Sequence, residues 1–371
     1  MTARPIRVLV IDDSAVVRQV ISDCLGAARG IEVVGTAADG HEAIECFERL
    51  CPDVVTLDIR MPVLDGLTTL DAMLALRPVP VIMVSILTQV GADATLEALE
   101  RGAIDYVPKS EGDDGAAAAL GEELIRKVQT VAGTNVKRIL EIRRERRDRH
   151  VKRQHEAPAV SKNVSHHCPT DLADKCIVVG VSTGGPPALS SLFEGLQPPL
   201  PPVVVVQHMP KNFTRALAWR LDSISALSIR EAVSGDVLRP NGVLIAPGGS
   251  HLEVRRQGGL VKAVVRDGEA VSSHKPSIDV LMHSAAATFG SQCLGVIMTG
   301  MGRDGVEGCL AIRAAGGYVL GQDADSSDVY GMNKIAFEAG AVDRQFHLEE
   351  AAAVVARQVR RLRTRAAAPA T

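Results

Sequence analysis

Three residues with the chemistry of a hydrolytic triad each follow a short apolar run of the sequence. Ser182 lies in G-V-S-T-G-G, His208 in Q-H-M-P and Asp304 in M-T-G-M-G-R-D-G. A serine hydroxyl is a poor nucleophile at neutral pH, so it needs a base within hydrogen-bond reach and a carboxylate that orients the base. The three residue types form a candidate Ser-His-Asp triad for acyl transfer, provided that the fold brings them together.

The apolar runs before these residues predict three buried strands. They are continuous and rich in β-branched side chains, which is typical of parallel strands covered on both faces. The runs are Cys176–Val179, Val203–Val206 and Leu294–Met298. In open α/β sheets the functional groups lie just beyond the carboxyl ends of the strands. All three candidates fall there, although each alone is typical of a turn, a helix cap or a hydrogen-bonded histidine.

The segment Gly180–Gly184 matches the G-x-S-x-G pattern, in which a sharp strand-to-helix turn exposes the serine hydroxyl. Glycines flank the serine because the turn leaves no room for side chains. Backbone N–H groups after the turn can point at an oxyanion. The chain order Ser, His, Asp differs from the Ser, Asp, His order of the α/β-hydrolase fold, so the pattern does not predict that fold.

The amino-terminal residues alternate strand and helix patterns five times, which predicts a flavodoxin-like (βα)5 doubly wound sheet. One helix is expected over Gly40–Leu50, with Asp39 as its cap. The expected strands are Arg7–Ile11, Ile31–Thr36, Val54–Leu57, Val81–Val84 and Ile104–Val107.

Polar residues gather at the ends of these strands. Asp12 and Asp13 follow the first strand, Asp58 the third, Ser85 the fourth and Lys109 the fifth. Three carboxylates at one sheet edge repel one another unless a divalent cation neutralises them, and oxygen ligands suit Mg²⁺. The lysine and the hydroxyl can bind phosphoryl oxygens. The pattern predicts an aspartyl-phosphate site at Asp58; helix caps and a solvated lysine are the simpler alternatives.

Four motifs of the second half follow in the order V-S-T-G-G-P-P-A-L, V-V-Q-H-M-P, S-H-K-P-S-I-D-V-L and M-T-G-M-G-R-D-G. Together they resemble the catalytic domain of the chemotaxis protein-glutamate methylesterases. The resemblance implies that Ser182 is the nucleophile, His208 the base and Asp304 the orienting acid. It also implies backbone donors to the oxyanion at Thr183 and Met301.

The motifs D-D-S, L-D-I-R-M-P-V-L-D-G and Y-V-P-K-S of the first half are similar to those of response-regulator receiver domains. This likeness implies that Asp58 accepts a phosphoryl group. The other implied site residues are the metal ligands Asp12, Asp13, Asp58 and the backbone carbonyl of Arg60, and the phosphoryl-binding and switch residues Ser85, Lys109 and Tyr106.

The two resemblances imply a phosphorylation-activated serine esterase. It would hydrolyse glutamyl γ-methyl esters on cytoplasmic helices of chemoreceptors, and deamidate glutamines there through the same acyl-enzyme. A histidine kinase of a chemosensory pathway is the implied phosphodonor, Mg²⁺ is the implied cofactor of the receiver, and the esterase step is expected to need none. The unphosphorylated receiver is expected to cover the hydrolase cleft, and phosphorylation to favour an open state.

Three residues depart from the family pattern. Arg60 stands where related esterases more usually carry an acidic or apolar residue, and it borders the phosphorylation pocket. Lys275 replaces a common arginine, and Asn333 replaces a usual proline. None of the three removes a triad residue or the phosphoryl acceptor. We therefore expect activity to be kept, with effects on phosphorylation rate, loop geometry or substrate preference.

Two other classes of function fit the sequence less well. A phosphorylation-dependent binding protein without catalysis conflicts with the complete triad. A DNA-binding response regulator conflicts with residues 174–348, which show an α/β pattern and no helix-turn-helix signal.

Composition bounds the remaining possibilities. The length of 371 residues suits two domains, and a net charge of -3 does not favour nucleic-acid binding. Seven cysteines without a C-x-x-C pair predict no disulfide framework and fit a reducing cytosol. The sequence lacks a signal-peptide profile and an apolar stretch of the ~18 residues that a spanning helix needs. A cytoplasmic protein without membrane insertion is therefore expected.

The expected domains are a receiver over 1–131, a basic flexible linker over 132–172, a catalytic domain over 173–350, and a helix end with a disordered tail over 351–371. The linker is interpreted as a charged spacer, with contact to anionic lipid or an acidic partner as the alternative. A metal site at His166-His167-Cys168 lacks a second ligand pair. The catalytic domain is expected to be mostly parallel and doubly wound, with an antiparallel hairpin of Val243–Val254 and Leu260–Arg266 on its sheet.

Overall fold

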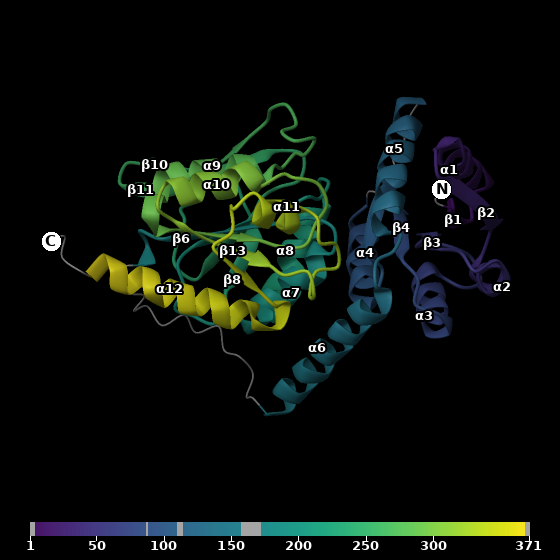
Figure 1. Cartoon of the computed structure of the whole chain (residues 1–371), viewed down its shortest axis with the longest axis horizontal. Coiled ribbons are helices and arrows are strands. Elements are labelled where there is room, and N and C mark those ends of the chain that lie inside the picture. Colours follow the sequence, from purple (N-terminus) through teal and green to yellow (C-terminus); the bar gives the residue numbers. More distant parts are fainter. Residues whose placement is uncertain (1–3, 87, 110–113, 157–171, 368–371) are drawn as a thin grey trace. The chain divides into compact units, whose positions relative to one another are not determined.

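A computed structural model describes residues 4–86, 88–109, 114–156 and 172–367 of the chain (Figure 1). The chain divides into two compact units, Met1–Asp148 and Arg149–Thr371. Each unit is built around its own parallel sheet. The possible metal ligands His166, His167 and Cys168 lie outside the described residues.

The first unit contains a five-stranded parallel sheet with the strand order β2-β1-β3-β4-β5. This is the predicted flavodoxin-like order, and each strand lies within two residues of its expected range. The order reverses direction beside β1, so the ends of β1 and β3 form the crevice where such sheets bind ligands. The strands are β1 (Ile6–Ile11), β2 (Ile31–Ala37), β3 (Val54–Asp58), β4 (Val81–Ile86) and β5 (Asp105–Lys109).

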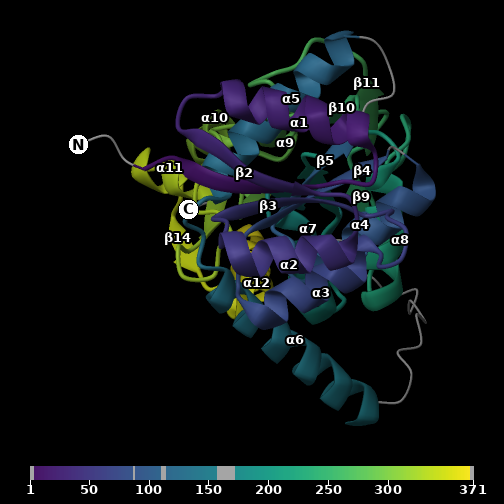
Figure 2. The same cartoon turned by 90° about the vertical axis from the view of Figure 1, so that its right-hand side faces the viewer.

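Five helices cover this sheet, with α1 and α5 on one face and α2 and α3 on the other (Figure 2). The cap predicted for α2 is confirmed, because the Asp39 side chain accepts hydrogen bonds from the backbone N–H groups of His41 and Glu42. The helices are α1 (Ala15–Ala27), α2 (Gly40–Leu50), α3 (Gly66–Leu76), α4 (Gln89–Arg101) and α5 (Asp114–Val131).

A sixth helix, α6 (Val136–Glu156), occupies much of the expected linker. Its first turns are packed: Val136 and Ile139 are buried, and the guanidinium of buried Arg143 donates to the carbonyls of Leu99 and Ala103 at the end of α4. A basic run predicts a solvated spacer only when its apolar positions have nothing to pack against. Here the first half of α6 packs on the receiver, and the domain boundaries expected from the sequence remain predictions.

The second unit contains a seven-stranded sheet whose order is β14-β13-β12-β6-β7-β9-β8. All its pairings are parallel. The three strands predicted to precede the triad residues are the neighbours β12, β6 and β7 at its centre. The strands are β6 (Cys176–Val181), β7 (Val203–Gln207), β8 (Ser228–Glu231), β9 (Gly242–Ile245), β12 (Cys293–Ile297), β13 (Tyr318–Gln322) and β14 (Arg344–Phe346).

The predicted hairpin differs from the observed one in its first strand. The expected Val243–Val254 is two strands: β9 joins the parallel sheet, and β10 (His251–Gln257) pairs with β11 (Leu260–Arg266) in a separate two-stranded sheet. The break falls at Pro247-Gly248-Gly249, where Pro247 has no N–H for a ladder and Gly249 has a φ of 78°. The hairpin therefore forms a sheet of its own and is not part of the seven-stranded sheet.

Helices cover both faces of the parallel sheet, with α9, α10 and the hairpin on one side and α7, α8 and α12 on the other (Figure 1). One apolar core cluster lies between the sheet and the first of these layers, and α7 and α8 also bury apolar side chains on the second face. Every helix among the described residues is too short or too polar to span a bilayer. The helices are α7 (Gly185–Gly195), α8 (Phe213–Ile224), α9 (Ile278–Phe289), α10 (Val306–Ala314), α11 (Met332–Glu338) and α12 (Ala351–Ala367), with 3₁₀ turns at Gly290–Gln292 and Leu348–Glu350.

Candidate active site

Ser182 lies in the turn that connects β6 to α7 and is half-buried. Its backbone N–H donates to the carbonyl of Thr299 at 3.0 Å, which ties the turn to the loop after β12. Gly184 has a φ of 75° and begins α7. A Cβ on Gly300 would lie 2.7 Å from Ser182 Cβ, so that loop can approach the serine only because residue 300 is a glycine.

His208 and Asp304 meet at the ends of β7 and β12. His208 Nε2 lies 2.7 Å from Asp304 Oδ2, and the two side chains are 7% and 0% exposed. The other ring nitrogen of His208, Nδ1, is buried without a hydrogen-bond partner among the described residues. An imidazole that donates Nε2–H to a carboxylate keeps Nδ1 as its acceptor. The ring is therefore arranged to take a proton at Nδ1.

Asp304 is held by donors from the start of α9 as well as by His208. Oδ1 accepts from Ser277 Oγ at 2.8 Å and from the Asp279 N–H at 3.1 Å, and Oδ2 also accepts from the Ile278 N–H at 2.7 Å. Burial favours the neutral carboxyl, but the hydrogen bond and charge of His208, with the Ile278 and Ser277 donors, lower the pKa of Asp304 to about 2. Asp304 therefore stays ionised at neutral pH.

Gln207 is a site residue that sequence reasoning missed. Its side-chain amide donates to the backbone carbonyl of Ser182 at 2.9 Å and to that of His208, the next residue in the chain, at 3.1 Å. The side chain is buried and bridges the ends of β6 and β7. A Cβ on Gly185 would lie 2.0 Å from Gln207 Oε1, so the second glycine of V-S-T-G-G leaves room for this bridge. A glutamine before the histidine carries no motif by itself.

His274 is a second residue that the candidate triad did not include. Its ring stacks on His208 with 3.7 Å between centroids and 14° between planes. Its Nδ1 lies 2.6 Å from the carbonyl of Ser272, in a loop where Ser272 and Ser273 have positive φ. The stacked ring covers one face of His208. The signal for it was the S-H-K-P-S motif.

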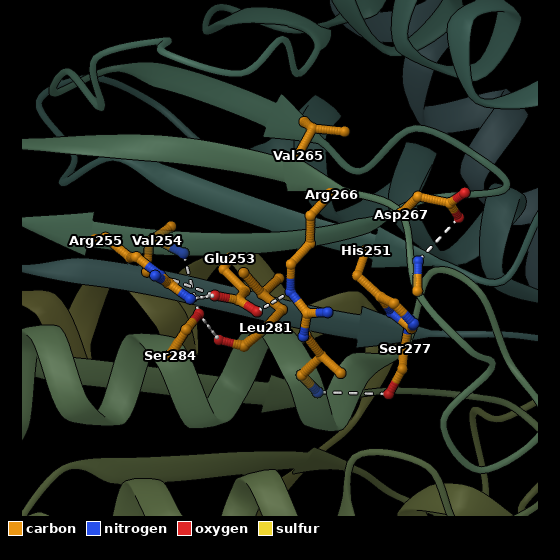
Figure 3. A network of polar contacts seen from close by, with 12 residues as sticks. His251, Glu253, Val254, Arg255, Val265, Arg266, Asp267, Ser277, Leu281 and Ser284 are labelled. Carbon is orange, nitrogen blue, oxygen red and sulfur yellow. Dashed lines mark hydrogen bonds and ion pairs between the residues drawn. The ribbon is translucent and has the colours of Figure 1, made fainter.

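The hairpin β10–β11 supports the start of α9 (Figure 3). Buried Glu253 accepts hydrogen bonds from the guanidinium groups of Arg255 and Arg266. His251, which is fully buried, accepts from the Ser277 N–H through Nδ1 at 3.3 Å, and its Nε2 lies 2.8 Å from the carbonyl of Glu269. The hairpin thereby holds Ser277, which in turn binds Asp304.

Of the two residues expected to stabilise an oxyanion, one follows Ser182 in the chain and the other lies in the loop that packs against it. Thr183 is buried at the entrance to α7, and its carbonyl accepts from Thr299 Oγ1 at 2.9 Å. Met301 follows Gly300, the residue packed against Ser182. The N–H groups of α7 add the positive end of a helix dipole to this place. The roles of the Thr183 and Met301 N–H groups remain predictions.

The acidic residues of the receiver come together as expected. Asp12 and Asp58 are buried, Asp13 is exposed, and one carboxylate oxygen from each lies within 4.8 Å of the others. Lys109 Nζ lies 2.8 Å from Asp12 Oδ2 and 2.7 Å from Asp58 Oδ2. Burial raises the pKa of Asp58 against the lowering effect of Lys109. An all-oxygen set that concentrates this much negative charge fits a hard divalent cation such as Mg²⁺.

The other expected receiver residues lie on β4, on β5 and just after β3. Ser85 is buried at the end of β4, and its hydroxyl donates to the carbonyl of Gly91 at 3.4 Å. Tyr106 is 4% exposed, and Lys127 Nζ lies 5.0 Å from its ring centroid. Arg60 is exposed and follows β3 by two residues. Its carbonyl as a metal ligand, and the switch role of Tyr106, remain predictions.

Two family models match the chain: the response regulator receiver domain over residues 8–120 and the CheB methylesterase over residues 177–355. A protein-glutamate methylesterase/protein-glutamine glutaminase of Sulfurimonas denitrificans is 42% identical over 91% of this chain and 94% of its own. One of Caulobacter vibrioides is 45% identical over 92% and 95%. The CheB methylesterase catalytic domain of Thermotoga maritima, a solved structure, is 36% identical over 50% of this chain and 98% of its own, with a TM-score of 0.49. The chain belongs to the protein-glutamate methylesterase/protein-glutamine glutaminase family, in which a receiver domain precedes a CheB methylesterase domain.

Proposed function

We propose that this protein is a phosphorylation-activated serine esterase that hydrolyses glutamyl γ-methyl esters of chemoreceptors and deamidates glutamines there. The observation that carries the proposal is the buried pair of His208 and Asp304 beside Ser182, at the ends of three neighbouring strands. The names of the relatives support the substrate, since they are methylesterases and glutaminases that act on protein glutamate and glutamine.

The proposed reaction begins with attack of Ser182 Oγ on the γ-carbonyl of the ester. His208 Nδ1 takes the hydroxyl proton, while Asp304 holds the resulting imidazolium through Nε2. The tetrahedral intermediate places its oxyanion toward the N–H groups of Thr183 and Met301. A donor of this kind contributes about 3 kcal/mol. The carbon–oxygen bond to the methoxy group breaks, and His208 gives its proton to the departing methanol.

Water then releases the glutamate by the reverse sequence. His208 takes a proton from water, the hydroxide attacks the acyl carbonyl, and Ser182 leaves with the proton returned by His208. A glutamine side chain enters the same acyl-enzyme with ammonia as the leaving group. Because one intermediate serves both substrates, one triad accounts for both activities in the relatives' names.

In the receiver, Asp58 would accept a phosphoryl group from a histidine kinase. The carboxylates of Asp12, Asp13 and Asp58 and the carbonyl of Arg60 would hold Mg²⁺, which supplies positive charge to the phosphoryl oxygens. Lys109, which lies against two of these carboxylates, and the hydroxyl of Ser85 would bind the phosphoryl oxygens of the product.

Ser182→Ala tests the proposal directly. Membranes that carry methylated chemoreceptors are incubated with wild-type protein and with the variant, and released methanol is measured. We expect methanol from the wild type and a loss of at least ~10³-fold in the variant, since the alanine has no nucleophile. Circular dichroism of both proteins controls for folding. Equal methanol release from the two would exclude Ser182 as the nucleophile.

A further inference from the structure

The amino ends of α9 and α10 exchange carboxylates. Asp304, two residues before α10, accepts hydrogen bonds from the backbone N–H groups of Ile278 at 2.7 Å and Asp279 at 3.1 Å, in the first turn of α9. Asp279 itself extends from α9 and accepts from the N–H of Gly308 at 2.7 Å, in the first turn of α10. Each helix thus provides the carboxylate that satisfies unpaired N–H groups of the other.

Glycines permit the close approach of the two helix ends. A Cβ on Gly308 would lie 2.5 Å from Met282 Cβ and 3.3 Å from Asp279 Oδ1. Gly305, with a φ of 95°, would place a Cβ 2.7 Å from Ile278 Cγ2. Real Cβ atoms do not approach other heavy atoms so closely. The contact between Asp279 and α10 therefore depends on glycine at positions 305 and 308.

Asp304 has no freedom to adjust if this arrangement moves. A carboxylate offers about four acceptor positions. Those of Asp304 are taken by His208 Nε2, Ser277 Oγ and the two α9 N–H groups, and the side chain is fully buried. Three of the four donors belong to residues 277–279. A shift of α9 relative to α10 would therefore carry the carboxylate away from His208 or break its hydrogen bonds.

We propose that Asp279 is a positioning residue for the esterase, which joins α9 to α10 so that Asp304 stays in contact with His208. This inference rests on the proposed function. Asp279 is 6% exposed and reaches the triad only through Asp304. Burial and the charge of Asp304 raise the pKa of Asp279 to about 6. Burial of a second carboxyl beside an ionised one is costly, which supports a role for its hydrogen bonds to α10.

Three substitutions in the full chain separate the possible roles. Asp279→Ala removes the acceptor for Gly308, whereas Asp279→Asn keeps a side-chain oxygen in the same position without the charge. Glu307→Ala is the matched control, because Glu307 is an exposed acid next to Gly308 and forms an ion pair with exposed Arg303 at 3.3 Å. The measurements are kcat and KM for receptor demethylation, and the low-field NMR signal of the His208 Nε2 proton in its bond to Asp304.

For Asp279→Ala we expect kcat to fall by about 10- to 100-fold with KM nearly unchanged, since a displacement of ~1 Å at the reacting groups can cost ~10²-fold. The low-field proton signal should broaden or disappear. Asp279→Asn should keep kcat within a few-fold of the wild type and keep the signal, and Glu307→Ala should match the wild type. A folded Asp279→Ala protein with wild-type kcat and signal overturns the proposal. So does an Asn variant as impaired as the Ala variant.

A further measurement on the wild type covers the case in which Asp279→Ala does not fold. The amide protons of Ile278, Asp279 and Gly308 should exchange with solvent at similar, slow rates, because one opening event would release all three. Rapid exchange of Gly308 with protection of the other two would show that Asp279 does not hold α10. The exchange and proton-signal measurements use no substrate. They therefore test the positioning role even if the wild type releases no methanol, a result that would instead reject the proposed function.

Discussion

At the triad, two neighbouring buried carboxyl groups have pKa values shifted in opposite directions. The pKa of Asp304 is lowered from 3.8 to about 2, whereas that of Asp279 is raised from 3.8 to about 6. Burial acts on both. The difference arises because Asp304 faces His208 and the donors of α9, while Asp279 faces the charge of Asp304. Asp304 thus remains an anion at neutral pH, whereas Asp279 titrates near pH 6.

These shifts predict opposite slopes of stability against pH. Between pH 2 and 4 the unfolded state binds more protons at Asp304, so the free energy of unfolding should rise with pH. Between pH 4 and 6 the folded state binds more protons at Asp279, so the free energy of unfolding should fall as the pH rises. Asp279→Asn should remove the second change, a fall on the order of 1–3 kcal/mol in the free energy of unfolding between pH 4 and 6. Urea unfolding of the catalytic unit across this pH range measures it.

The control for that experiment is Asp174→Asn, since Asp174 is 74% exposed and its ion pair with Arg256 is long, at 3.7 Å. It should leave the pH dependence unchanged. If Asp279→Asn retained the fall in stability between pH 4 and 6, the raised pKa would have to belong to another group.

At the scale of elements, glycines set how closely helices approach one another and the sheet. Gly308 lies in α10 against α9, and a Cβ there would meet Met282 Cβ at 2.5 Å. Gly26 lies in α1 with nothing within 4 Å of its Cβ position. Replacement of glycine by alanine should therefore lower stability at position 308 and raise it at position 26, because a helix favours alanine over glycine wherever space is available.

We predict that Gly308→Ala destabilises the catalytic unit by about 1–3 kcal/mol, since the added methyl group overpacks the contact between α9 and α10. It should also lower the esterase rate, because the same contact positions Asp304. Gly26→Ala should leave the rate unchanged and raise the stability of the receiver by up to ~1 kcal/mol. Thermal unfolding and demethylation assays of both variants test this, and equal stability changes would contradict it.

The helix α6 provides a second prediction at this scale. The buried Arg143 guanidinium donates to the Leu99 carbonyl at 2.5 Å and the Ala103 carbonyl at 3.1 Å. Arg143→Ala leaves these carbonyls at the end of α4 without that donor, so we expect about 1–3 kcal/mol less stability for the receiver. Exposed Arg144 supplies the control, and Arg144→Ala should change stability by less than ~0.5 kcal/mol.

Hydrogen exchange distinguishes packing of α6 from a free helix. In the wild type the amides of residues 139–146 should be protected, and Arg143→Ala should release them while Arg144→Ala does not. Fast exchange of this segment in the wild type would support the flexible linker expected from the sequence.

At the scale of the whole molecule, the chain combines a receiver with an esterase. Ligand-driven activation requires that phosphorylation stabilise one state of the protein over another. The receiver cluster of Asp12, Asp13 and Asp58 lies against Lys109, which now balances part of its charge. A phosphoryl group and a cation would change the charge balance between these carboxylates and Lys109 at the ends of β1, β3 and β5. The effect of that change on the protein can be measured as the esterase rate.

We predict that acetyl phosphate with Mg²⁺ raises the demethylation rate of the wild type, and that Asp58→Asn shows no such increase. Chelation of the metal should abolish the activation while the rate without phosphodonor persists, because the reaction proposed for Ser182, His208 and Asp304 uses none of the proposed metal ligands of the receiver. Methanol release measures both rates. Activation of Asp58→Asn by acetyl phosphate would place the phosphoryl group elsewhere.

Local patterns in the sequence were enough to predict most of the strands and the polar residues that follow them. The apolar runs before Ser182, His208 and Asp304 proved to be neighbouring parallel strands, because a β-branched run between turns has few other stable arrangements. The same reasoning failed for Val243–Val254, because a single strand was expected to run through the turn residues Pro247-Gly248-Gly249. It also treated α6 as a spacer, since a charge-rich helix shows its packed positions only once its neighbours are known.

The sequence by itself determined the two chemistries of this protein, because motif residues close together in the chain are constrained by the turns that hold them. Only the tertiary structure decided how the triad is supported. The bond between His208 and Asp304 joins residues 96 positions apart, and the hydrogen bond from Gly308 to Asp279 spans 29. Such contacts depend on how helices cross and how closely glycines let them approach. No local pattern encodes that geometry, so the roles of Gln207, His274 and Asp279 emerged only from the fold.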